Sequence, residues 1–137
     1  MTKTPAYWNR AKKFLSKKDK IMSKLIENYK SPSETVLISR KDIFYSLCKS
    51  IIGQQISVVA ANSVFSKFKK KCHNKINPKT ISKLSTIQLR SCGLSGQKVK
   101  GIKSLAKQIL DKSFNPRLID KMNDEEAIIY LSQLRQI

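Results

Sequence analysis

The sequence predicts an all-α fold, arranged as an array of about seven or eight helices joined by short loops. Apolar residues recur at helical spacing in every clearly periodic segment of the 137 residues. Only 4 glycines and 4 prolines are present, which argues against a turn-rich all-β domain. Hydrophobic residues make up 40% of the chain, which is enough for a packed core. Because no linker or repeat is visible, these features predict a single helical domain over residues 1–137.

Two helices are expected near the N-terminus. Apolar spacing within residues 8–15 marks a first short helix, and residues 19–29 carry their apolar side chains on one helical face. Residues 31–33 (Ser-Pro-Ser) then break the chain, and residues 36–38 form a short extended or irregular run.

Two longer helices are expected on either side of a polar turn. Asp42 is a good N-cap for the first helix, whose wide apolar stripe extends to Ile52 and stops at Gly53. Ser57 is suited to cap the second helix, which stays apolar on one face through Phe68. At its C-terminus, where the helix dipole favours cations, the second helix carries Lys67, Lys69, Lys70 and Lys71.

Four more helices follow, each after a side chain that is able to cap a helix N-terminus. The capping residues, in chain order, are Asn77, Ser85, Ser95 and Asn123. Two of them have the spacing of capping boxes, Ser85 with Gln88 and Asn123 with Glu126. Residues 115–116 (Asn-Pro) break the chain before the last helix, whose apolar stripe runs to Leu134.

The charge balance is strongly basic. Lysine and arginine number 28 against 9 acidic residues, so the formal net charge is +19. A basic surface raises the local concentration of phosphate groups, so a nucleic acid is the first expected partner. An anionic membrane surface is the second interpretation, and a solvated surface that reflects coding bias is the third. No apolar run reaches the roughly 18 residues that span a membrane, and residues 1–10 do not resemble a signal peptide.

The residues that commonly bind metals are few and scattered. Cys48, Cys72 and Cys92 lie far apart without a Cys-x-x-Cys pair, so a disulfide framework or an all-cysteine zinc site is not expected. The single histidine, His73, lies in a polar loop. The sequence therefore predicts reduced thiols, a cytoplasmic protein, and neither a metal nor a cofactor.

Two polar segments interrupt the apolar pattern at helix junctions. Residues 50–57 place the adjacent amides of Gln54 and Gln55 before Ser57. An amide both donates and accepts hydrogen bonds, which suits base edges, and a helix N-terminus presents N–H groups to phosphate. Residues 93–100 form a turn that leads into a helix beside two lysines, an arrangement suited to placing a side chain between bases. Ordinary exposed turns and helix caps are the alternative interpretation of both segments.

In this order, the two segments resemble those of the helix–hairpin–helix DNA glycosylases, in the alkylpurine (DNA-3-methyladenine glycosylase II) branch. The string Gly-Gln-Gln-Ile-Ser-x-x-Ala-Ala over residues 53–61 carries most of the resemblance. Gly-Leu-Ser-x-x-Lys over residues 93–98 strengthens it, and weaker matches extend from residues 7–8 to residues 105–106. The resemblance thus covers nearly the whole chain.

The resemblance implies base-excision repair of duplex DNA that contains alkylated purines of the 3-methyladenine type. Such enzymes flip the damaged nucleotide into a pocket, where an aromatic surface holds the cationic base. A carboxylate then stabilises the oxocarbenium-like sugar while water attacks, as in glycoside hydrolysis. The implied protein is a monomeric, monofunctional N-glycosylase, associated with the nucleoid in a bacterium.

The resemblance also implies roles for residues at the first junction. Gln54 matches the side chain that fills the gap left by the flipped base or lies beside the orphaned partner. Gln55 is expected to line the same edge of the cleft, and the helix that begins after Ser57 is expected to face phosphate.

At the second junction, the turn that contains Leu94, Ser95 and Gln97 matches the wedge loop of the family. The aligned wedge position is Gly96, which has no side chain to insert, so Leu94 or Gln97 is expected to take this role. At the start of the following helix, the side chains expected near phosphates are Lys98 and Lys100.

The catalytic part of the family's domain is not recognised in the chain. The glycine-rich hairpin and the catalytic aspartate are expected beyond Ile137, and we assign no catalytic residue. We therefore expect the N-terminal two-thirds of a glycosylase domain, inactive on its own. Two alternatives stay open: a glycosylase of the same superfamily for oxidised or mismatched bases, and a non-catalytic basic helical DNA-binding protein.

Overall fold

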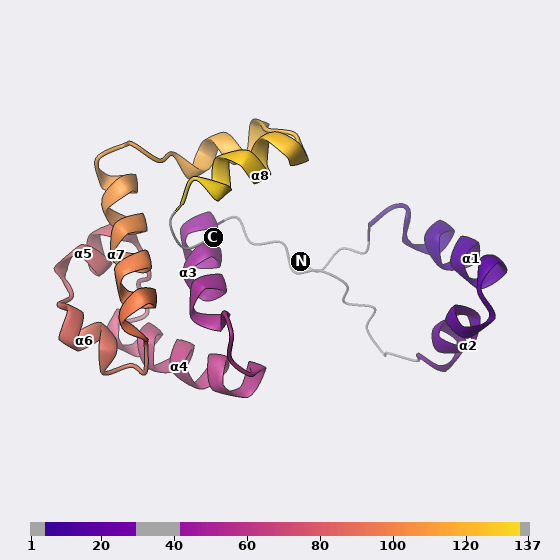
Figure 1. The fold of residues 1–137 in the computed structure, drawn as a ribbon, viewed down its shortest axis with the longest axis horizontal. Coiled ribbons are helices and arrows are strands. Elements are labelled where there is room, and N and C mark those ends of the chain that lie inside the picture. The colour runs from indigo at the N-terminus through magenta and orange to yellow at the C-terminus, as the bar shows by residue number, and fades with distance from the viewer. Residues whose placement is uncertain (1–4, 30–41, 135–137) are drawn as a thin grey trace. The chain divides into compact units, whose positions relative to one another are not determined.

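The computed structural model describes residues 5–29 and 42–134, and every regular element in these ranges is a helix (Figure 1). The prediction of an all-α fold is confirmed. The chain divides into two compact units, residues 1–41 and 42–137. The predicted break at 31–33 and the predicted extended run at 36–38 lie outside the described residues.

Within residues 5–29, the first unit contains two packed helices, α1 (Trp8–Lys18) and α2 (Lys20–Asn28). Asp19 separates them, because its extended backbone ends α1 and its side chain caps α2. The Asp19 carboxylate accepts hydrogen bonds from the N–H groups of Ile21 (2.7 Å) and Met22 (3.0 Å). Both predicted helices are therefore present, and a single side chain defines the junction between them.

The second unit consists of six α-helices and one 3₁₀ helix within residues 42–134. Helix α7 lies between α3 on one side and α5 and α6 on the other (Figure 1). The elements are α3 (Ile43–Gly53), α4 (Val58–Lys71), α5 (Pro78–Lys83), α6 (Thr86–Arg90), α7 (Gly96–Leu110), the 3₁₀ helix η1 (Pro116–Lys121) and α8 (Asp124–Ser132).

The predicted N-caps are confirmed throughout this unit. The side chains that accept a backbone N–H at the start of their helix are Asp42, Ser57, Asn77, Ser85, Ser95 and Asn123. Both capping boxes are complete: the Gln88 and Glu126 side chains accept the N–H groups of Ser85 (2.8 Å) and Asn123 (3.0 Å). Local side-chain chemistry thus defines where each helix begins.

Two local features differ from the expectation. Gly53 was expected to stop its helix, yet Gly53 is itself helical, and the left-handed residue is Gln55, with φ 57°. The chain break at Asn115-Pro116 is followed by η1, which the sequence pattern did not indicate. Helix α7 has already ended at Leu110, so the Asn-Pro pair does not end it as expected. Asn115 instead accepts the N–H of Arg117 (3.1 Å) and starts a short 3₁₀ helix.

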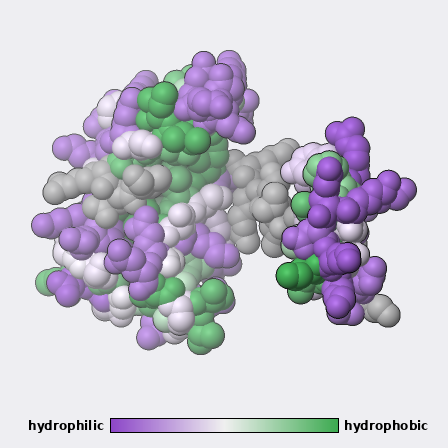
Figure 2. All heavy atoms as spheres, turned by 45° about the vertical axis from the view of Figure 1, so that its right-hand side comes forward, coloured by the Kyte–Doolittle hydropathy of each residue, from purple (hydrophilic) through white to green (hydrophobic). Residues whose placement is uncertain are grey.

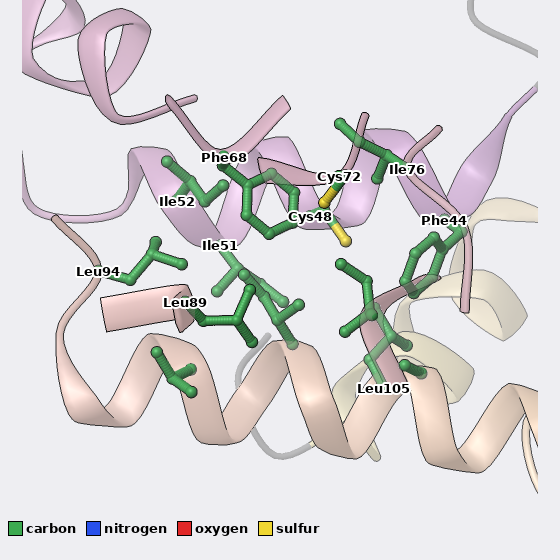
Figure 3. Close-up of a cluster of buried hydrophobic side chains, with 14 of the residues drawn as sticks. Phe44, Cys48, Ile51, Ile52, Phe68, Cys72, Ile76, Leu89, Leu94 and Leu105 are labelled. Carbon is green, nitrogen blue, oxygen red and sulfur yellow. The ribbon is translucent and has the colours of Figure 1, made fainter. Parts of the chain in front are cut away.

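The core of the second unit lies where α3, α4 and α7 meet. Figure 3 shows Ile51 and Ile52 of α3, Phe68 of α4 and Leu105 of α7 pointing toward one another. Phe68 and Ile52 are fully buried. Burying side chains of this size contributes roughly 1.5–3 kcal/mol each relative to leaving them exposed. The apolar stripes predicted for these helices therefore form one shared core.

Helix α8 is only partly covered within the described residues. Tyr130 stacks on Phe114 with ring centroids 5.0 Å apart, and its hydroxyl accepts the N–H of Asn115 (2.9 Å). Leu134 is buried, whereas Ile128 remains 64% exposed. The predicted apolar stripe of this helix is thus buried at its C-terminal end and exposed at its centre.

The three cysteines are free thiols in the core of the second unit. Burial, and to a lesser extent the nearby Cys92, raises the pKa of Cys72 from 9.0 to about 11. Burial also raises the pKa of Cys48 and of Cys92. Because the thiolate is the reactive form of cysteine, these thiols are poor nucleophiles at neutral pH.

The buried thiol of Cys72 makes stability depend on pH. The folded state holds its proton more tightly than the unfolded state, so its stabilising effect is complete below pH 9 and is lost between pH 9 and about 11. We expect the free energy of unfolding, measured by urea titration, to fall across this window. A Cys72→Ala variant should be less stable but should show a shallower fall. An equally steep fall in the variant would assign the effect to other groups.

Candidate nucleic-acid interface

A single lysine connects the two polar turns that the sequence predicts to contact DNA. The ammonium Nζ of Lys98, in the first turn of α7, donates hydrogen bonds to the carbonyl oxygens of Ile52 and Gln54, each at 2.8 Å. Both carbonyls belong to the C-terminal end of α3, where backbone acceptors have no partner within the helix. The positive charge also lies at the negative end of the α3 dipole. The two turns are therefore held side by side by a contact across 44 residues or more.

The turn between α3 and α4 has an unusual backbone. Gln54 caps α3 in an extended conformation and is half-buried, whereas Gln55 is exposed and left-handed, with φ 57°. A left-handed conformation is uncommon for a residue with a side chain and costs free energy. Ser57 then starts α4 by accepting the N–H of Ala60 (3.2 Å). The turn thus presents one amide to solvent and keeps its neighbour partly packed.

Exposed apolar residues follow the two glutamines. Ile56 is 40% exposed, and Val58 and Val59, in the first turn of α4, are 75% and 80% exposed. Isolated exposed valines are ordinary, but three apolar side chains beside two amides form a surface that is able to contact both base edges and sugars. The sequence interpretation did not include these residues among the candidates.

The turn between α6 and α7 depends on a glycine. Gly93 has φ 93°, a conformation that side chains rarely adopt, and a Cβ atom there would lie 3.2 Å from Cγ2 of Val64 in α4. Ser95 accepts the N–H of Lys98 at 3.3 Å and so caps α7. The close approach to α4 places this turn beside the helix that begins after the glutamines.

The structure separates the two wedge candidates. Leu94 is 3% exposed and belongs to the core, so it reaches DNA only by leaving its packing site. Gln97 is exposed in the first turn of α7. Gln97 is therefore the candidate whose side chain is able to reach DNA without unfolding the turn.

The two lysines predicted near phosphates also differ. Lys100 is exposed, whereas Lys98 is half-buried and binds the end of α3. Lys98 thus acts first on the protein backbone, as a positioning residue for the turn that contains Gln54. Lys100 keeps its charge at the surface, where phosphate contact requires no rearrangement.

The stretch of sequence that contains both turns carries basic residues but no acidic ones. From residue 43 to residue 110 the sequence contains twelve lysines and one arginine but no aspartate or glutamate. Figure 2 shows hydrophilic side chains over much of the visible surface of the larger unit, with hydrophobic side chains between them. A surface with one sign of charge attracts the phosphate backbone at long range. Only the total charge was considered in the sequence interpretation, although this acid-free stretch is visible in the sequence itself.

No group of three or more histidine, cysteine or acidic side chains within 5–29 and 42–134 is arranged to hold a metal ion. No helix in those same ranges is long and apolar enough to cross a membrane.

The chain resembles two curated proteins of fission yeast, Schizosaccharomyces pombe. It is 27% identical to DNA-3-methyladenine glycosylase 1 over 121 residues, covering 86% of this chain and 52% of the relative. It is 28% identical to the alkylbase DNA glycosidase-like protein mag2 over 134 residues, covering 95% of this chain and 62% of the relative. The chain thus spans between half and two thirds of the length of these relatives.

Solved structures share the fold. The S. pombe 3-methyladenine DNA glycosylase Mag1, in complex with abasic DNA, matches with a TM-score of 0.82 and 24% identity, over 93% of this chain and 64% of the other. A DNA-3-methyladenine glycosidase from Bacillus halodurans matches with a TM-score of 0.71 and 20% identity, over 99% of this chain and 59% of the other. Residues 48–134, which contain both turns and the lysine that joins them, match the model of the HhH-GPD superfamily. The chain therefore belongs to the HhH-GPD superfamily of base-excision DNA repair proteins.

Proposed function

We propose that the chain forms the DNA-recognition part of a glycosylase that hydrolyses the N-glycosidic bond of alkylated purines, of the 3-methyladenine type, in duplex DNA. The observation that carries the proposal is the pair of turns joined by Lys98. Both turns lie within the region that matches the repair superfamily. We further propose that both units belong to one glycosylase domain, which acts as a monomer.

In the proposed complex, each of the two turns has a different role in opening the duplex. Gln97 enters the stack as the wedge, and the amide of Gln54 occupies the space of the flipped base or pairs with the orphaned partner. An amide suits this place because it offers a donor and an acceptor to whichever base is left unpaired. Lys98 holds the backbone of the Gln54 turn, so the amide is oriented before DNA arrives and loses less entropy on binding.

The basic surface supplies affinity that does not depend on sequence. Lys100 and the N-terminus of α4 after Ser57 face the phosphates on either side of the lesion. The exposed apolar residues Ile56 and Val58 contact sugars and the opened minor-groove edge. The phosphate contacts position the protein on the duplex. The side chains of Gln54 and Gln97 contact the place in the stack where a base is missing.

The proposal is tested by binding to abasic DNA, which presents the gap directly. We expect the chain to bind an abasic duplex more tightly than an undamaged duplex of the same sequence. A Gln54→Ala variant should lose between about twofold and tenfold of that preference, the value of one hydrogen bond. The measurement is fluorescence anisotropy with both duplexes at one salt concentration.

A matched control is Gln133→Ala, which removes an exposed glutamine at the C-terminal end of α8. This variant should keep the full preference for abasic DNA. Equal affinity of the unmodified chain for the abasic and undamaged duplexes would reject the proposed function.

A further inference from the structure

We propose that the chain carries a second DNA-binding surface, which contacts the phosphate backbone of the duplex on one side of the lesion. The surface lies at the end of α4 opposite the glutamine turn and extends onto α5. We call it the lysine basin and define it by six side chains: Lys67, Lys70, Lys71, Lys75, Lys79 and Lys83. Its assignment to DNA rests on the proposed function, whereas its charge and shape do not.

The basin is formed by two adjoining hollows in the second unit. One hollow, of about 550 Å³, is lined by Lys67, Lys70 and Lys71. The other, of about 440 Å³, is lined by Lys71, Lys75, Lys79 and Lys83. Lys71 and His73 line both hollows, so the two share a wall. Among the residues that the structure describes, no aspartate or glutamate lines either hollow.

A tight reversal after α4 brings these lysines to one surface. His73 and Asn74 both adopt the left-handed conformation, with φ 51° and 60°. The N–H of Asn74 donates to the carbonyl oxygen of Lys69 at 2.9 Å, which closes the end of α4 and turns the chain back. Asn77 then starts α5 by accepting the N–H of Thr80 (2.9 Å). Lysines from the last turns of α4 and from α5 therefore line the same pair of hollows.

Helix stabilisation explains only part of this cluster. Cations at the C-terminus of α4 are favoured by the helix dipole, which accounts for Lys70 and Lys71. Lys79, however, lies in the first turn of α5, and Lys75 precedes that helix. At a helix N-terminus the dipole disfavours a positive charge. Like charges gathered around shared hollows also repel one another, so the arrangement favours an anionic partner.

The form of the basin suits an extended polyanion more than a small ion. Five of its six lysines are exposed, and Lys71 is half-buried. A small anion is held best by a closed set of converging donors, whereas these ammonium groups are spread along two helices and the loop between them. Duplex DNA presents one phosphate charge for about every 1.7 Å of its axis, which matches a row of flexible cations.

The position of the basin distinguishes it from the lesion-contacting turns. Helix α4 has 14 residues, so its two ends are about 21 Å apart at 1.5 Å per residue. That length corresponds to about six base pairs at 3.4 Å each. The basin therefore reaches phosphates outside the opened base pair, and it contributes affinity for any duplex rather than preference for a damaged one.

The test compares two triple variants that remove the same charge. The basin variant is Lys70→Gln, Lys75→Gln and Lys79→Gln. The control variant is Lys107→Gln, Lys112→Gln and Lys121→Gln, which removes three exposed lysines outside the basin. Affinity for an undamaged duplex is measured over a series of salt concentrations. The basin variant should bind roughly tenfold or more weakly, and the slope of log affinity against log salt should be smaller by about 2–3.

The control variant should change the slope by less than about 1, because its lysines make no phosphate contact. The preference for abasic over undamaged DNA should be unchanged in the basin variant. The two proposals can therefore fail separately. If the unmodified chain does not prefer abasic DNA, the lesion-recognition function is rejected, but the salt-dependence result for the basin still stands. Equal slopes for the basin and control variants would overturn the basin.

A measurement on the unmodified chain covers the case in which a triple variant does not fold. Brief lysine acetylation, with and without undamaged duplex, is read by mass spectrometry. DNA should protect Lys70, Lys75 and Lys79 but leave Lys112 and Lys121 modified. The same protection by vesicles of phosphatidylserine and phosphatidylcholine, without protection by DNA, would overturn the assignment to DNA and favour a membrane surface.

Discussion

Replacing Lys98 with methionine is expected to lower the free energy of unfolding by about 2–3 kcal/mol. The side chain keeps its length, but the two hydrogen bonds to the carbonyl oxygens of Ile52 and Gln54 are lost. Hydrogen bonds from charged donors are stronger than neutral ones, and the half-buried carbonyls lose their partner without a replacement. Urea unfolding followed by circular dichroism measures the change.

The matched control is Lys100→Met, because Lys100 is exposed on the same helix. It should change stability by less than about 0.5 kcal/mol. Lys98→Arg keeps the charge and should recover part of the lost stability. A Lys98→Met variant as stable as the Lys100→Met variant would show that the contact between the turns contributes nothing.

The same variants distinguish positioning from phosphate contact. If Lys98 positions the glutamine turn, Lys98→Met lowers the preference for abasic DNA while the salt dependence of binding stays the same. If Lys98 contacts phosphate instead, the slope of log affinity against log salt falls by about 0.9 and the preference is kept. Lys100→Met should show the second pattern.

Helix positions were predictable from the sequence because they are set by neighbours in the chain. Asp42 and Ser57 accept N–H groups three residues ahead, and both capping boxes close within three residues. Such contacts depend on the backbone over a single turn, so residue type and spacing are sufficient. The 3₁₀ helix after Asn115 was missed because the Asn-Pro pair was expected only to break the chain, whereas the Asn115 side chain also caps the residues that follow.

The contacts and burial of the site residues were not predictable from the sequence in the same way. A lysine near a glycine turn fits a phosphate contact, and only the packing of α7 against α3 shows that Lys98 meets two carbonyl oxygens more than 40 residues away. Leu94 and Gln97 are three residues apart in one turn, but the Leu94 side chain is buried in the core. The motif therefore predicted which turns form the proposed interface, while the fold distinguished the residues within them.

The lysine basin was also predictable only in part from the sequence. Its charge is visible as an acid-free stretch from residue 43 to residue 110. Its shape depends on the left-handed pair His73 and Asn74, residue types that adopt this conformation more often than most but far less regularly than glycine. Composition therefore predicted a nucleic-acid partner, but not the surface that would hold it.

Several acidic residues of the described chain already have structural roles, which argues against a role for them in catalysis. Asp19 and Asp42 cap helices, and Glu126 completes a capping box. Hydrogen bonds from Ser113 lower the pKa of Asp111, whose carboxylate is exposed. A carboxylate that assists glycosidic cleavage has to face the reacting sugar inside a pocket, and helix capping at the surface does not provide that geometry.

We therefore expect the chain alone to release no 3-methyladenine from methylated duplex DNA above the spontaneous rate. Enzymes accelerate their reactions by about a millionfold or more, so even a poor glycosylase would be visible above this background. The comparison is a chimera in which residue 137 is followed by the part of the S. pombe DNA-3-methyladenine glycosylase 1 that continues beyond its match to this chain. The chimera should release base, whereas that segment alone should not. Excision by the unmodified chain would show that one of its own acids, rather than a following segment, supplies the catalytic carboxylate.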